Sequence, residues 1–470
     1  MSKIKFGTDG WRAIIAEDFT VNNVARVAEA AANWLLKKND QPKVVVGHDC
    51  RFAGELFAET VTKVLVSKGV KVFLAKGFVS TPMISLGAVN YQCDLGIILT
   101  ASHNPPSYNG FKLKGSFGGP LSPAQVQEIE DIIPDHPSID YKNIAMEDAT
   151  SKGLLSIVPL ENEYIHHVEQ NFDLEAIRNA NLKLVYDAMY GAGQNVMKRL
   201  FPDIKLLHCE NNPGFYGQAP EPIHKNLGEL AQLMASGNFD CALVTDGDAD
   251  RIGMYDGKGN FIDSHHIILL LVHYLHKYKG LTGKVCTAFS TTPKVEKLCR
   301  HYNLPLETVK IGFKYICEIM LREDVLLGGE ESGGIAIKGH IPERDGIWMG
   351  LVIWEFMAKA GKNLPELIKE IYEIVGAFSY ERSDLHLTQD VKDRIVRGTK
   401  EGKYSSFGSF QVKRVEDLDG YKYFFDDQNN QWLLIRASGT EPVLRVYAEA
   451  PSKSGAAAII KAAQETLLSS

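Results

Sequence analysis

The segment Cys241–Arg251, CALVTDGDADR, joins an apolar run directly to an acidic turn. The same arrangement recurs along the chain, with Val44–Val46 before GHD, Gly96–Leu99 before TASHN and Val325–Leu327 before GGEESGG. Each run is typical of a buried strand, and segments with helical spacing of apolar residues, such as Leu56–Lys68, lie between them. This alternation predicts an α/β fold with a mainly parallel sheet, whose polar loops follow the carboxyl ends of the strands.

Three interruptions divide this pattern. The stretch 131–153 is polar and carries prolines, a turn region covers 255–260, and a third break falls at 378–385. Beyond it, alternating strands and a final alanine-rich helix indicate a small α+β domain. A length of 470 residues suggests about three domains. The breaks divide the chain into four predicted domains, 1–150, 151–255, 256–378 and 379–470.

Composition excludes several classes of protein. The chain has 51 Lys and Arg against 58 Asp and Glu, a formal net charge of −7, so it lacks the basic surface of a bulk nucleic-acid binder. Its 7 cysteines include no C-x-x-C pair, which favours reduced, buried thiols over a disulfide or zinc framework. The longest apolar stretch, Ile267–Val272, is too short to span a membrane, and no leader-like segment begins the chain. We therefore expect a cytoplasmic protein without nucleic-acid or membrane partners.

A serine follows the apolar run Gly96–Leu99, in the loop Thr100–Pro105, TASHNP. At the end of a strand, Ser102 would be well exposed for nucleophilic attack, although a Ser/Asn/Pro turn is the structural alternative. There is no G-x-S-x-G, and adjacent side chains in an extended segment point to opposite sides, so a Ser102–His103 hydrolase pair is not predicted. Ser102 needs a different activator.

The acidic turn contains Asp246, Asp248 and Asp250, at alternate positions. In a near-extended loop these three carboxylates share one side and would repel one another unless a cation lies between them. Ligands that are all oxygen favour magnesium, manganese or calcium over zinc. An EF-hand is excluded because Arg251 stands where that loop needs glycine. A solvated acidic turn is the remaining alternative.

Two further loops carry polar groups suited to a ligand. Gly328–Gly334, GGEESGG, offers carboxylate and hydroxyl groups that suit sugar hydroxyls, although a mobile glycine turn is the alternative. Arg436–Pro442, RASGTEP, offers a guanidinium and a Ser-Gly-Thr turn that suit a phosphate, although a hairpin turn is the alternative. Neither G-x-x-x-x-G-K-[ST] nor a G-x-G-x-x-G after a strand is present, which disfavours nucleotide-driven phosphoryl transfer.

These four motifs, in this order, resemble those of the α-D-phosphohexomutase superfamily, which includes phosphoglucomutases, phosphomannomutases and phosphoglucosamine mutases. The likeness runs from FGTDGWR at Phe6 to RASGTEP ending at Pro442. It implies an α/β protein with a four-domain, heart-shaped architecture: three related mixed α/β domains and a C-terminal α+β domain of the TATA-binding-protein type. The four loops would line one central cleft.

The resemblance also implies roles for individual residues. Ser102 would carry the phosphoryl group, and Asp246, Asp248 and Asp250 would hold Mg²⁺ together with a phosphoserine oxygen. Because phosphoryl transfer depends mostly on placement and electrostatics, Lys112 is a candidate, with Arg12, for positioning the group and moving the hydroxyl proton. The expected contacts to the phosphorylated hexose are His103, Arg251, Lys314, Glu330, Ser332, His340, Arg344, Arg436, Ser438, Gly439, Thr440 and Arg445.

The implied reaction interconverts glucose 1-phosphate and glucose 6-phosphate, with glucose 1,6-bisphosphate as intermediate and activator. Glu331, between Glu330 and Ser332, resembles phosphoglucomutases more than phosphoglucosamine mutases, which tend to have glutamine there. Two positions depart from common patterns: Asp9 replaces a frequent serine, and Gly334 replaces a frequent histidine or phenylalanine.

Several alternatives stay open at this point. A phosphomannomutase or dual-specificity enzyme would use the same residues, and so would a hexose 1,6-bisphosphate synthase. A magnesium-dependent phosphatase would release phosphate from the same serine. A non-enzymatic carbohydrate-binding descendant would be expected to lose the nucleophile or a metal ligand, and this chain retains all of them.

Overall fold

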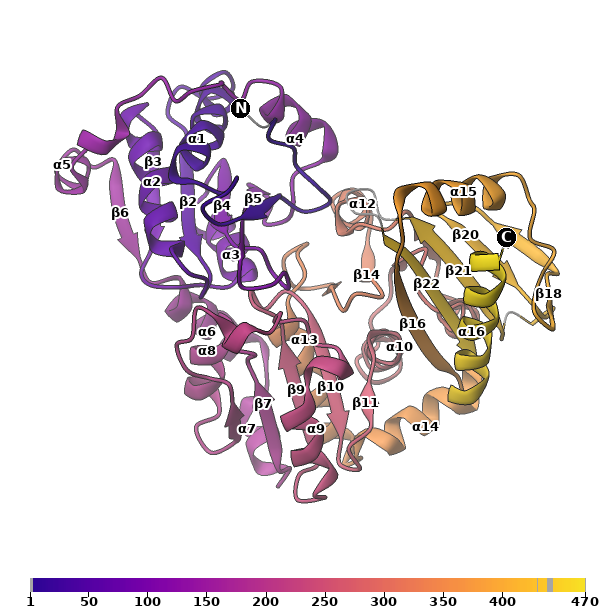
Figure 1. The fold of residues 1–470 in the computed structure, drawn as a ribbon. Coiled ribbons are helices and arrows are strands. Elements are labelled where there is room, and N and C mark those ends of the chain that lie inside the picture. Colours follow the sequence, from indigo (N-terminus) through magenta and orange to yellow (C-terminus); the bar gives the residue numbers. More distant parts are fainter. Residues whose placement is uncertain (1–2, 429, 438–442, 470) are drawn as a thin grey trace. The chain divides into compact units, whose positions relative to one another are not determined.

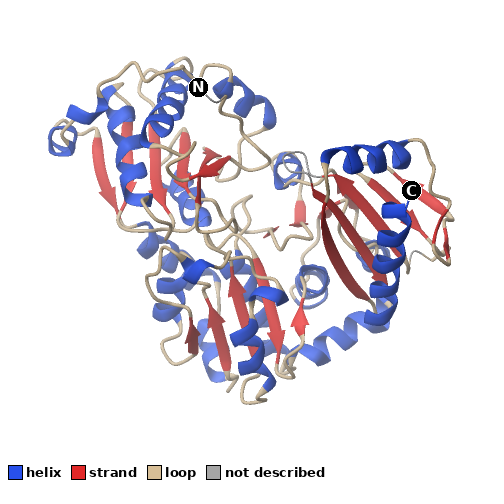
Figure 2. Cartoon of the chain, viewed as in Figure 1, coloured by secondary structure: helices blue, strands red, loops and turns tan. Residues whose placement is uncertain are grey.

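A computed structural model describes residues 3–428, 430–437 and 443–469. The chain forms two compact units, Met1–Lys284 with Gly312–Leu367 and Val285–Ile311 with Ile368–Ser470, called here the first and second unit. Helices and strands alternate through most of the chain, and antiparallel strands dominate its C-terminal part (Figure 1, Figure 2). The predicted α/β class, with a smaller α+β domain at the end, is confirmed.

The N-terminal sheet is mainly parallel, as predicted, but it contains one antiparallel strand. Its strand order is β1-β5-β4-β2-β3-β6, in which β4, β2, β3 and β6 are parallel and β5 is antiparallel to both of its neighbours, β1 and β4. The cause is the connection 100–107 between β4 and β5, which is shorter than the dozen or so residues that a parallel crossover requires. The strands are β1 (Trp11–Ile14), β2 (Lys43–His48), β3 (Lys71–Ala75), β4 (Leu95–Leu99), β5 (Tyr108–Gly115) and β6 (Leu155–Val158).

Helices cover this sheet with apolar faces. The side chain of Thr20 caps α1 (Val21–Leu36) by accepting a hydrogen bond from the Asn23 amide, and α1 packs beside α2 (Gly54–Ser67) (Figure 1). Trp34 and Phe57 from these helices join β2 and β4 in one buried core. The other helices of this region are α3 (Thr81–Asn90), α4 (Pro123–Glu130) and α5 (Met146–Ser151).

A second mixed sheet follows in the first unit, in the order β11-β10-β9-β7-β8. Its strands are β7 (Leu184–Asp187), β8 (Lys205–Leu207), β9 (Cys241–Thr245), β10 (Ile252–Asp256) and β11 (Phe261–Ile262). The accompanying helices are α6 (Leu160–Asn171), α7 (Leu174–Asn179), α8 (Gln194–Leu200) and α9 (Gly228–Ala235). The acidic turn therefore joins two antiparallel strands, β9 and β10.

The remainder of the first unit repeats this hairpin arrangement. The strands β14 (Val325–Gly329) and β15 (Ile335–Ile337) are antiparallel and are joined by the turn that contains Glu330 and Ser332. Three of the polar loops thus connect a buried strand to an antiparallel neighbour. The helices are α10 (Ser264–His273), α12 (Phe313–Met320) and α13 (Gly346–Ala360), which Asp345 caps by accepting from the Trp348 amide.

The second unit combines a βαβ piece with the C-terminal sheet. In the βαβ piece, β12 (Lys284–Ala288) and β13 (Leu306–Val309) are parallel, with α11 (Lys294–Tyr302) between them. The C-terminal sheet is antiparallel, in the order β16-β22-β21-β20-β19, and α16 lies along β16 and β22 (Figure 1). Its elements are β16 (Ser379–His386), β19 (Arg414–Glu416), β20 (Tyr421–Phe424), β21 (Trp432–Ala437), β22 (Val443–Ala450), α15 (Gln389–Lys400) and α16 (Lys453–Ser469), preceded by α14 (Leu364–Val375).

Two sequence expectations for the second unit were wrong. The segment 378–385, expected as a break, forms most of the edge strand β16. Its side chains are largely half-exposed, so apolar alternation is weak, and hydrogen bonds to β22 define the strand instead. The single strand expected at 411–415 is divided between β18 (Phe410–Gln411), which pairs with β17 (Ser406–Phe407), and β19.

Two other sequence expectations can be compared with the structure. All 7 cysteines are free and buried, as predicted. Among the described residues, no helix has the length and apolar character needed to cross a membrane.

Candidate functional site

Ser102 meets the acidic turn in the first unit. Its side chain is buried, and its Oγ donates a hydrogen bond of 2.6 Å to Asp246 Oδ2. Gly247, the next residue of that turn, lies so close that a Cβ there would be 2.5 Å from the Ser102 carbonyl oxygen. The loop that follows β4 and the loop that follows β9 are therefore in direct contact.

The backbone around Ser102 is held by a residue that sequence analysis missed. Ser102 has a left-handed conformation, with φ of 52°, which is uncommon for a residue with a side chain. The buried guanidinium of Arg51 donates to the carbonyl oxygens of Ser102 at 2.6 Å and Asn104 at 2.7 Å, and also to those of Pro105 and Tyr108. Arg51 follows β2 in the GHDCR segment, so its place after a buried strand was the available signal.

The left-handed turn also brings His103 to the same side as Ser102. His103 Nδ1 lies 3.4 Å from Ser102 Oγ, whereas an extended loop would have separated the two side chains. Burial lowers the pKa of His103 well below its usual value, and the neighbouring cation Arg251 lowers it further. His103 is therefore a neutral imidazole beside the serine.

The three aspartates of the acidic turn converge as predicted, but for a different reason. Asp246, Asp248 and Asp250 are fully buried, and one carboxylate oxygen from each lies within 4.8 Å of the others. The segment is a tight turn, with Ala249 left-handed at φ of 57°, and is not extended. Thr81, at the start of α3, fixes the turn: its amide donates to the Asp248 carbonyl at 3.0 Å and its hydroxyl donates to the Asp248 carboxylate.

The donor set of this turn fits a hard divalent cation. Among the described residues, the buried oxygens Asp248 Oδ1 and Asp250 Oδ1 have no hydrogen-bond partner. Burial and the charges of Asp248 and Asp250 raise the pKa of Asp246 well above its usual range. Buried unpartnered carboxylate oxygens are unfavourable unless a cation compensates them. We infer that Asp246, Asp248 and Asp250 could hold such an ion.

Lys112 provides positive charge at the same point. From the buried face of β5, its Nζ lies 2.7 Å from Asp248 Oδ2 and 3.0 Å from both Asp250 Oδ2 and Asp9 Oδ2. Burial alone would lower the pKa of Lys112, but the three carboxylates raise it above its usual value. Burial likewise opposes ionisation of Asp248, but the charge and hydrogen bond of Lys112 lower its pKa below the usual range. This pair is therefore ionised.

Two arginines named from the sequence lie beside the serine and the acidic turn. Arg12, on β1, donates to Asn104 Oδ1 at 2.6 Å, within the loop of Ser102. The backbone amide of Arg251 donates to Asp246 Oδ1 at 3.0 Å. The buried Arg251 Nε has no hydrogen-bond partner among the described residues.

The turn after β14 connects to the acidic turn through its backbone. The amide of Ile252 donates to the Gly333 carbonyl at 3.1 Å, and Glu330 Oε1 accepts from the Gly312 amide at 2.9 Å. Burial raises the pKa of Glu330. Ser332 is half-buried in this turn, and Lys314, the second residue of α12, has its Nζ 5.5 Å from the centroid of the Tyr315 ring.

Arg344 accounts for the glycine at position 334. A Cβ on Gly334 would overlap the Arg344 side chain, so a larger residue there would displace the guanidinium. Arg344 Nη2 lies 2.8 Å from Asp250 Oδ2 and also pairs with the Asp9 carboxylate. Asp9, which departs from the common serine, is therefore the shared partner of Lys112 and Arg344.

His340 belongs to a different cluster. Its Nε2 lies 3.0 Å from Asp345 Oδ2, and its ring stacks on Trp348 at a centroid distance of 3.8 Å. Tyr164 donates to the same Asp345 carboxylate. In the part of the chain that the structure describes, no hydrogen bond or ion pair joins His340 to Ser102 or to the aspartates of the acidic turn.

The fourth motif lies in the second unit. Arg436, on β21, contacts Asp419 Oδ1 through its Nε at 3.3 Å, and is the cross-strand partner of Arg445 on β22. The buried Arg445 Nε has no partner among the described residues. The predicted phosphate-binding residues Ser438, Gly439 and Thr440 lie outside the described residues.

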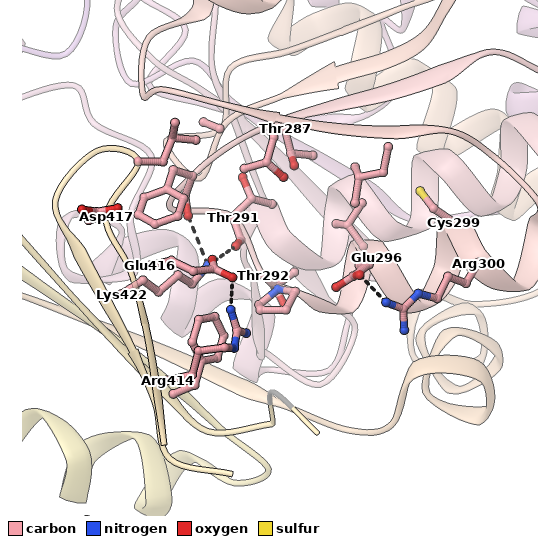
Figure 3. Close-up of a pocket in the computed structure, with 18 of the residues that line it drawn as sticks. Thr287, Thr291, Thr292, Glu296, Cys299, Arg300, Arg414, Glu416, Asp417 and Lys422 are labelled. Atoms are coloured by element: carbon pink, nitrogen blue, oxygen red, sulfur yellow. Dashed lines mark hydrogen bonds and ion pairs between the residues drawn. The ribbon is translucent and has the colours of Figure 1, made fainter. Parts of the chain in front are cut away.

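The second unit also contains a cavity that the sequence did not indicate, because its walls come from two distant segments. The cavity has a volume of about 800 Å³ and is lined by residues of β12, α11, β13, β19 and β20. Figure 3 gives a close-up of its lining side chains. Among the lining residues, the buried Lys422 donates to the carbonyl oxygens of Phe289 at 3.1 Å and Thr291 at 3.0 Å (Figure 3). Arg414 pairs with Glu416 at the wall. The cations drawn there are thus held by protein groups.

Comparison with known proteins gives matches along most of the chain. Models for the phosphoglucomutase/phosphomannomutase family match in order: alpha/beta/alpha domain I at 3–139, domain II at 162–259, domain III at 263–375 and the C-terminal domain at 411–465. A solved structure from Thermus thermophilus, of a protein described as a phosphomannomutase, has 33% sequence identity and a TM-score of 0.87, with 99% of each chain covered. The predicted architecture of three α/β domains and a C-terminal domain is confirmed.

Curated relatives carry related names. A phosphoglucosamine mutase of Methanococcus maripaludis is 31% identical over 470 residues, covering 97% of this chain and 96% of the relative. A phosphoglucomutase/phosphomannomutase of Thermococcus kodakarensis is 28% identical over 453 residues, covering 95% of each. The names agree on phosphate transfer within a sugar phosphate and differ in the sugar.

Proposed function

The chain belongs to the phosphoglucomutase/phosphomannomutase family of the α-D-phosphohexomutase superfamily and is a phosphate-transferring mutase, and from this premise we propose that it interconverts glucose 1-phosphate and glucose 6-phosphate. Phosphorylated Ser102 would be the donor and glucose 1,6-bisphosphate the intermediate. The observation that carries the proposal is the contact of 2.6 Å between Ser102 Oγ and Asp246, inside a buried cluster of carboxylates and cations.

The acidic turn would hold Mg²⁺ through Asp246, Asp248 and Asp250. Their unpartnered oxygens and all-oxygen chemistry support that choice over zinc. When bound, the ion would supply positive charge that offsets the negative charge of a phosphoserine. The protein's own contribution is to keep these carboxylates buried, close together and next to the serine.

In the transfer, the bond between Ser102 Oγ and phosphorus breaks while a sugar hydroxyl bonds to the phosphorus, and the proton of that hydroxyl passes to Ser102 Oγ, which becomes a hydroxyl again. Lys112 and Arg12 would position the phosphoryl group, which is most of what this reaction requires. The raised pKa of Lys112 favours a role as a permanent cation over a role in moving the proton. On the return step, Asp246 and the neutral His103 both lie within reach of the Ser102 proton.

The substrate would be held by the polar loops that the sequence analysis named. Glu330 and Ser332 would bind sugar hydroxyls, with Arg251, Lys314 and Arg344 as further contacts. Arg436, Ser438, Gly439, Thr440 and Arg445 would bind the phosphate that does not react. The contacts of His340 with Asp345 and Trp348 give no support to its expected role in substrate binding.

Glucose is proposed because Glu331 follows Glu330 as in phosphoglucomutases, and because Lys314 and Arg344 resemble contacts of glucose-type members. Glucosamine phosphate is the second candidate, because a relative with 31% identity is named a phosphoglucosamine mutase. The two substrates differ at one position of the ring, where an amine would introduce a positive charge. A carboxylate in the sugar loop does not by itself distinguish glucose phosphate from glucosamine phosphate as the substrate.

The test is phosphorus NMR of the protein with Mg²⁺ and glucose 1-phosphate, with and without a trace of glucose 1,6-bisphosphate. Growth of glucose 6-phosphate that the trace accelerates, and that Ser102→Ala abolishes, would support the proposal. Parallel tubes contain mannose 1-phosphate and glucosamine 1-phosphate. Faster turnover of either compound would identify it, in place of glucose 1-phosphate, as the preferred substrate. Release of inorganic phosphate would indicate a phosphatase, and accumulation of bisphosphate would indicate a synthase.

A further inference from the structure

Lys114 lies two residues beyond Lys112 on β5, so both side chains point to the same face of the sheet. Both are fully buried, yet only Lys112 reaches the acidic turn. Lys114 Nζ instead lies 2.7 Å from Glu343 Oε2, in the loop before α13, and the Glu343 side chain is also fully buried. We propose that Lys114 and Glu343 form a positioning pair that holds Arg344 and Lys112 in place for phosphoryl transfer.

Glu343 is attached directly to the base of Arg344. Its Oε1 accepts from the Arg344 backbone amide at 3.0 Å and lies 3.4 Å from Arg344 Nε, while its Oε2 accepts from Ser85 Oγ at 3.2 Å. The far end of Arg344 contacts Asp250 at 2.8 Å. The guanidinium is thus held at one end by Glu343 and at the other by a candidate metal ligand.

Asp9 joins the same pair to Lys112. Its carboxylate lies 3.0 Å from Lys112 Nζ and 3.4 Å from Lys114 Nζ, and it also pairs with Arg344. Burial opposes ionisation of Asp9, but Arg344, Lys112 and Lys114 lower its pKa well below the usual range. Three cations therefore share the Asp9 carboxylate, and the position of each cation depends on the contacts of the other two.

Removing either member of the pair should redistribute these contacts. Without the Lys114 ammonium, Glu343 becomes a buried carboxylate that attracts Arg344 away from Asp250. Without the Glu343 carboxylate, Asp9 is the one ion-pair partner left to Lys114 among the described residues, and Lys114 competes there with Lys112 and Arg344. Because displacement of a positioning group by about 1 Å can lower a rate by about 100-fold, both changes should slow transfer without removing a reacting group.

The inference rests on the proposed site and not on the identity of the sugar. The variants are Lys114→Met, Glu343→Gln and the double variant K114M/E343Q, with Lys114→Arg as the conservative change. The double variant leaves no unpaired buried charge, so it should fold even if a single variant does not. Lys68→Met and Glu29→Gln are the matched controls, because Lys68 Nζ lies 3.1 Å from the buried Glu29 within the same domain.

The first measurement is kcat and KM on whichever hexose phosphate the wild-type protein converts, together with the melting temperature. We expect kcat to fall about 10- to 100-fold in each single variant with KM little changed, and to recover in part in Lys114→Arg. The double variant has the wild-type net charge. If the single variants lose kcat only because they change the net charge, the double variant should therefore regain the wild-type kcat. If the pair instead positions Arg344 and Lys112, kcat should stay low in the double variant, which lacks both members. A wild-type kcat in the double variant would overturn the proposal. So would a loss of kcat no larger than in the controls at equal loss of melting temperature.

The second measurement does not depend on turnover. Mn²⁺ binding is followed by electron paramagnetic resonance in wild-type protein, Lys114→Met, Arg344→Met and the variant that combines both changes. Lys114→Met should tighten Mn²⁺ binding several-fold by drawing Arg344 from Asp250, and this effect should disappear when residue 344 is methionine. An effect that persists there would overturn the role of the pair. Absence of turnover on every hexose phosphate would count against the proposed function alone.

Discussion

Lys112 Nζ lies 2.7 Å from Asp248 Oδ2, so a lysine of the N-terminal sheet neutralises a carboxylate of the second sheet's acidic turn. The same ammonium would oppose a divalent cation bound by that carboxylate. Lys112→Met should therefore tighten Mn²⁺ binding several-fold, measured by electron paramagnetic resonance, while it lowers kcat by about 100-fold or more because the phosphoryl group loses its cation. Lys68→Met is the control, and weaker Mn²⁺ binding in Lys112→Met would contradict this account.

Removal of the divalent ion should stop turnover completely. Asp248 Oδ1 and Asp250 Oδ1 are buried without partners among the described residues, and their charge is only partly compensated by protein cations. We expect dialysis against a chelator to abolish turnover, and Mg²⁺ or Mn²⁺ to restore it. Asp250→Asn should lower the affinity for the ion by about tenfold or more, because the change removes one anionic ligand. Restoration by Zn²⁺ in preference to Mg²⁺ would contradict the assignment from oxygen ligands.

Much of the site could be predicted because the motifs follow buried strands. The apolar runs before Ser102 and Asp246 predicted β4 and β9, and both loops meet at that end of the strands. The path of each loop could not be predicted in this way. Ser102 and Ala249 adopt left-handed conformations that no residue type in TASHNP or DGDADR requires. The nearness of His103 to Ser102 depends on that local geometry.

Residues that act across long sequence separations were also missed. Lys114 and Glu343 contact each other across more than two hundred positions, and neither stands in a motif that the sequence singled out. Arg51 was overlooked for the same reason: its four carbonyl acceptors belong to the loop of Ser102, about fifty residues later. A buried charge has no pattern of its own in a single sequence, and only the fold shows which charge compensates it.

Arg51 should be essential for the loop that carries the serine. Arg51→Met would leave several buried carbonyl oxygens without donors, at a cost of about 1–3 kcal/mol each before relaxation. We expect the free energy of unfolding in urea to fall by about 3 kcal/mol and kcat to fall by at least tenfold, since Ser102 would no longer keep its left-handed turn. Arg51→Lys should recover only part of either loss, because an ammonium has fewer donors. Wild-type kcat in Arg51→Met would contradict the role assigned to this side chain.

The stability of the second sheet should depend on pH through His208. A hydrogen bond to Asp187 raises the pKa of His208 to about 9 against opposing burial, and Glu229 adds to the increase. The folded protein therefore binds a proton more tightly than the unfolded chain, whose histidine titrates near 6.5. This stabilisation is complete below about pH 6.5 and is lost as the pH rises through 9.

Urea unfolding of wild-type protein and His208→Gln at intervals from pH 6 to pH 10 tests this linkage. The difference in free energy of unfolding between them should be on the order of 2 kcal/mol at the acidic end, because the salt bridge to exposed Glu229 is screened by solvent. It should shrink steadily above pH 6.5. His136→Gln, at an exposed site, controls for the loss of a histidine elsewhere. The sign of the pH dependence follows from which state, folded or unfolded, binds the proton more tightly. A difference in free energy of unfolding that stays constant, or grows with pH, would therefore show that the Asp187 contact does not favour the protonated ring of His208.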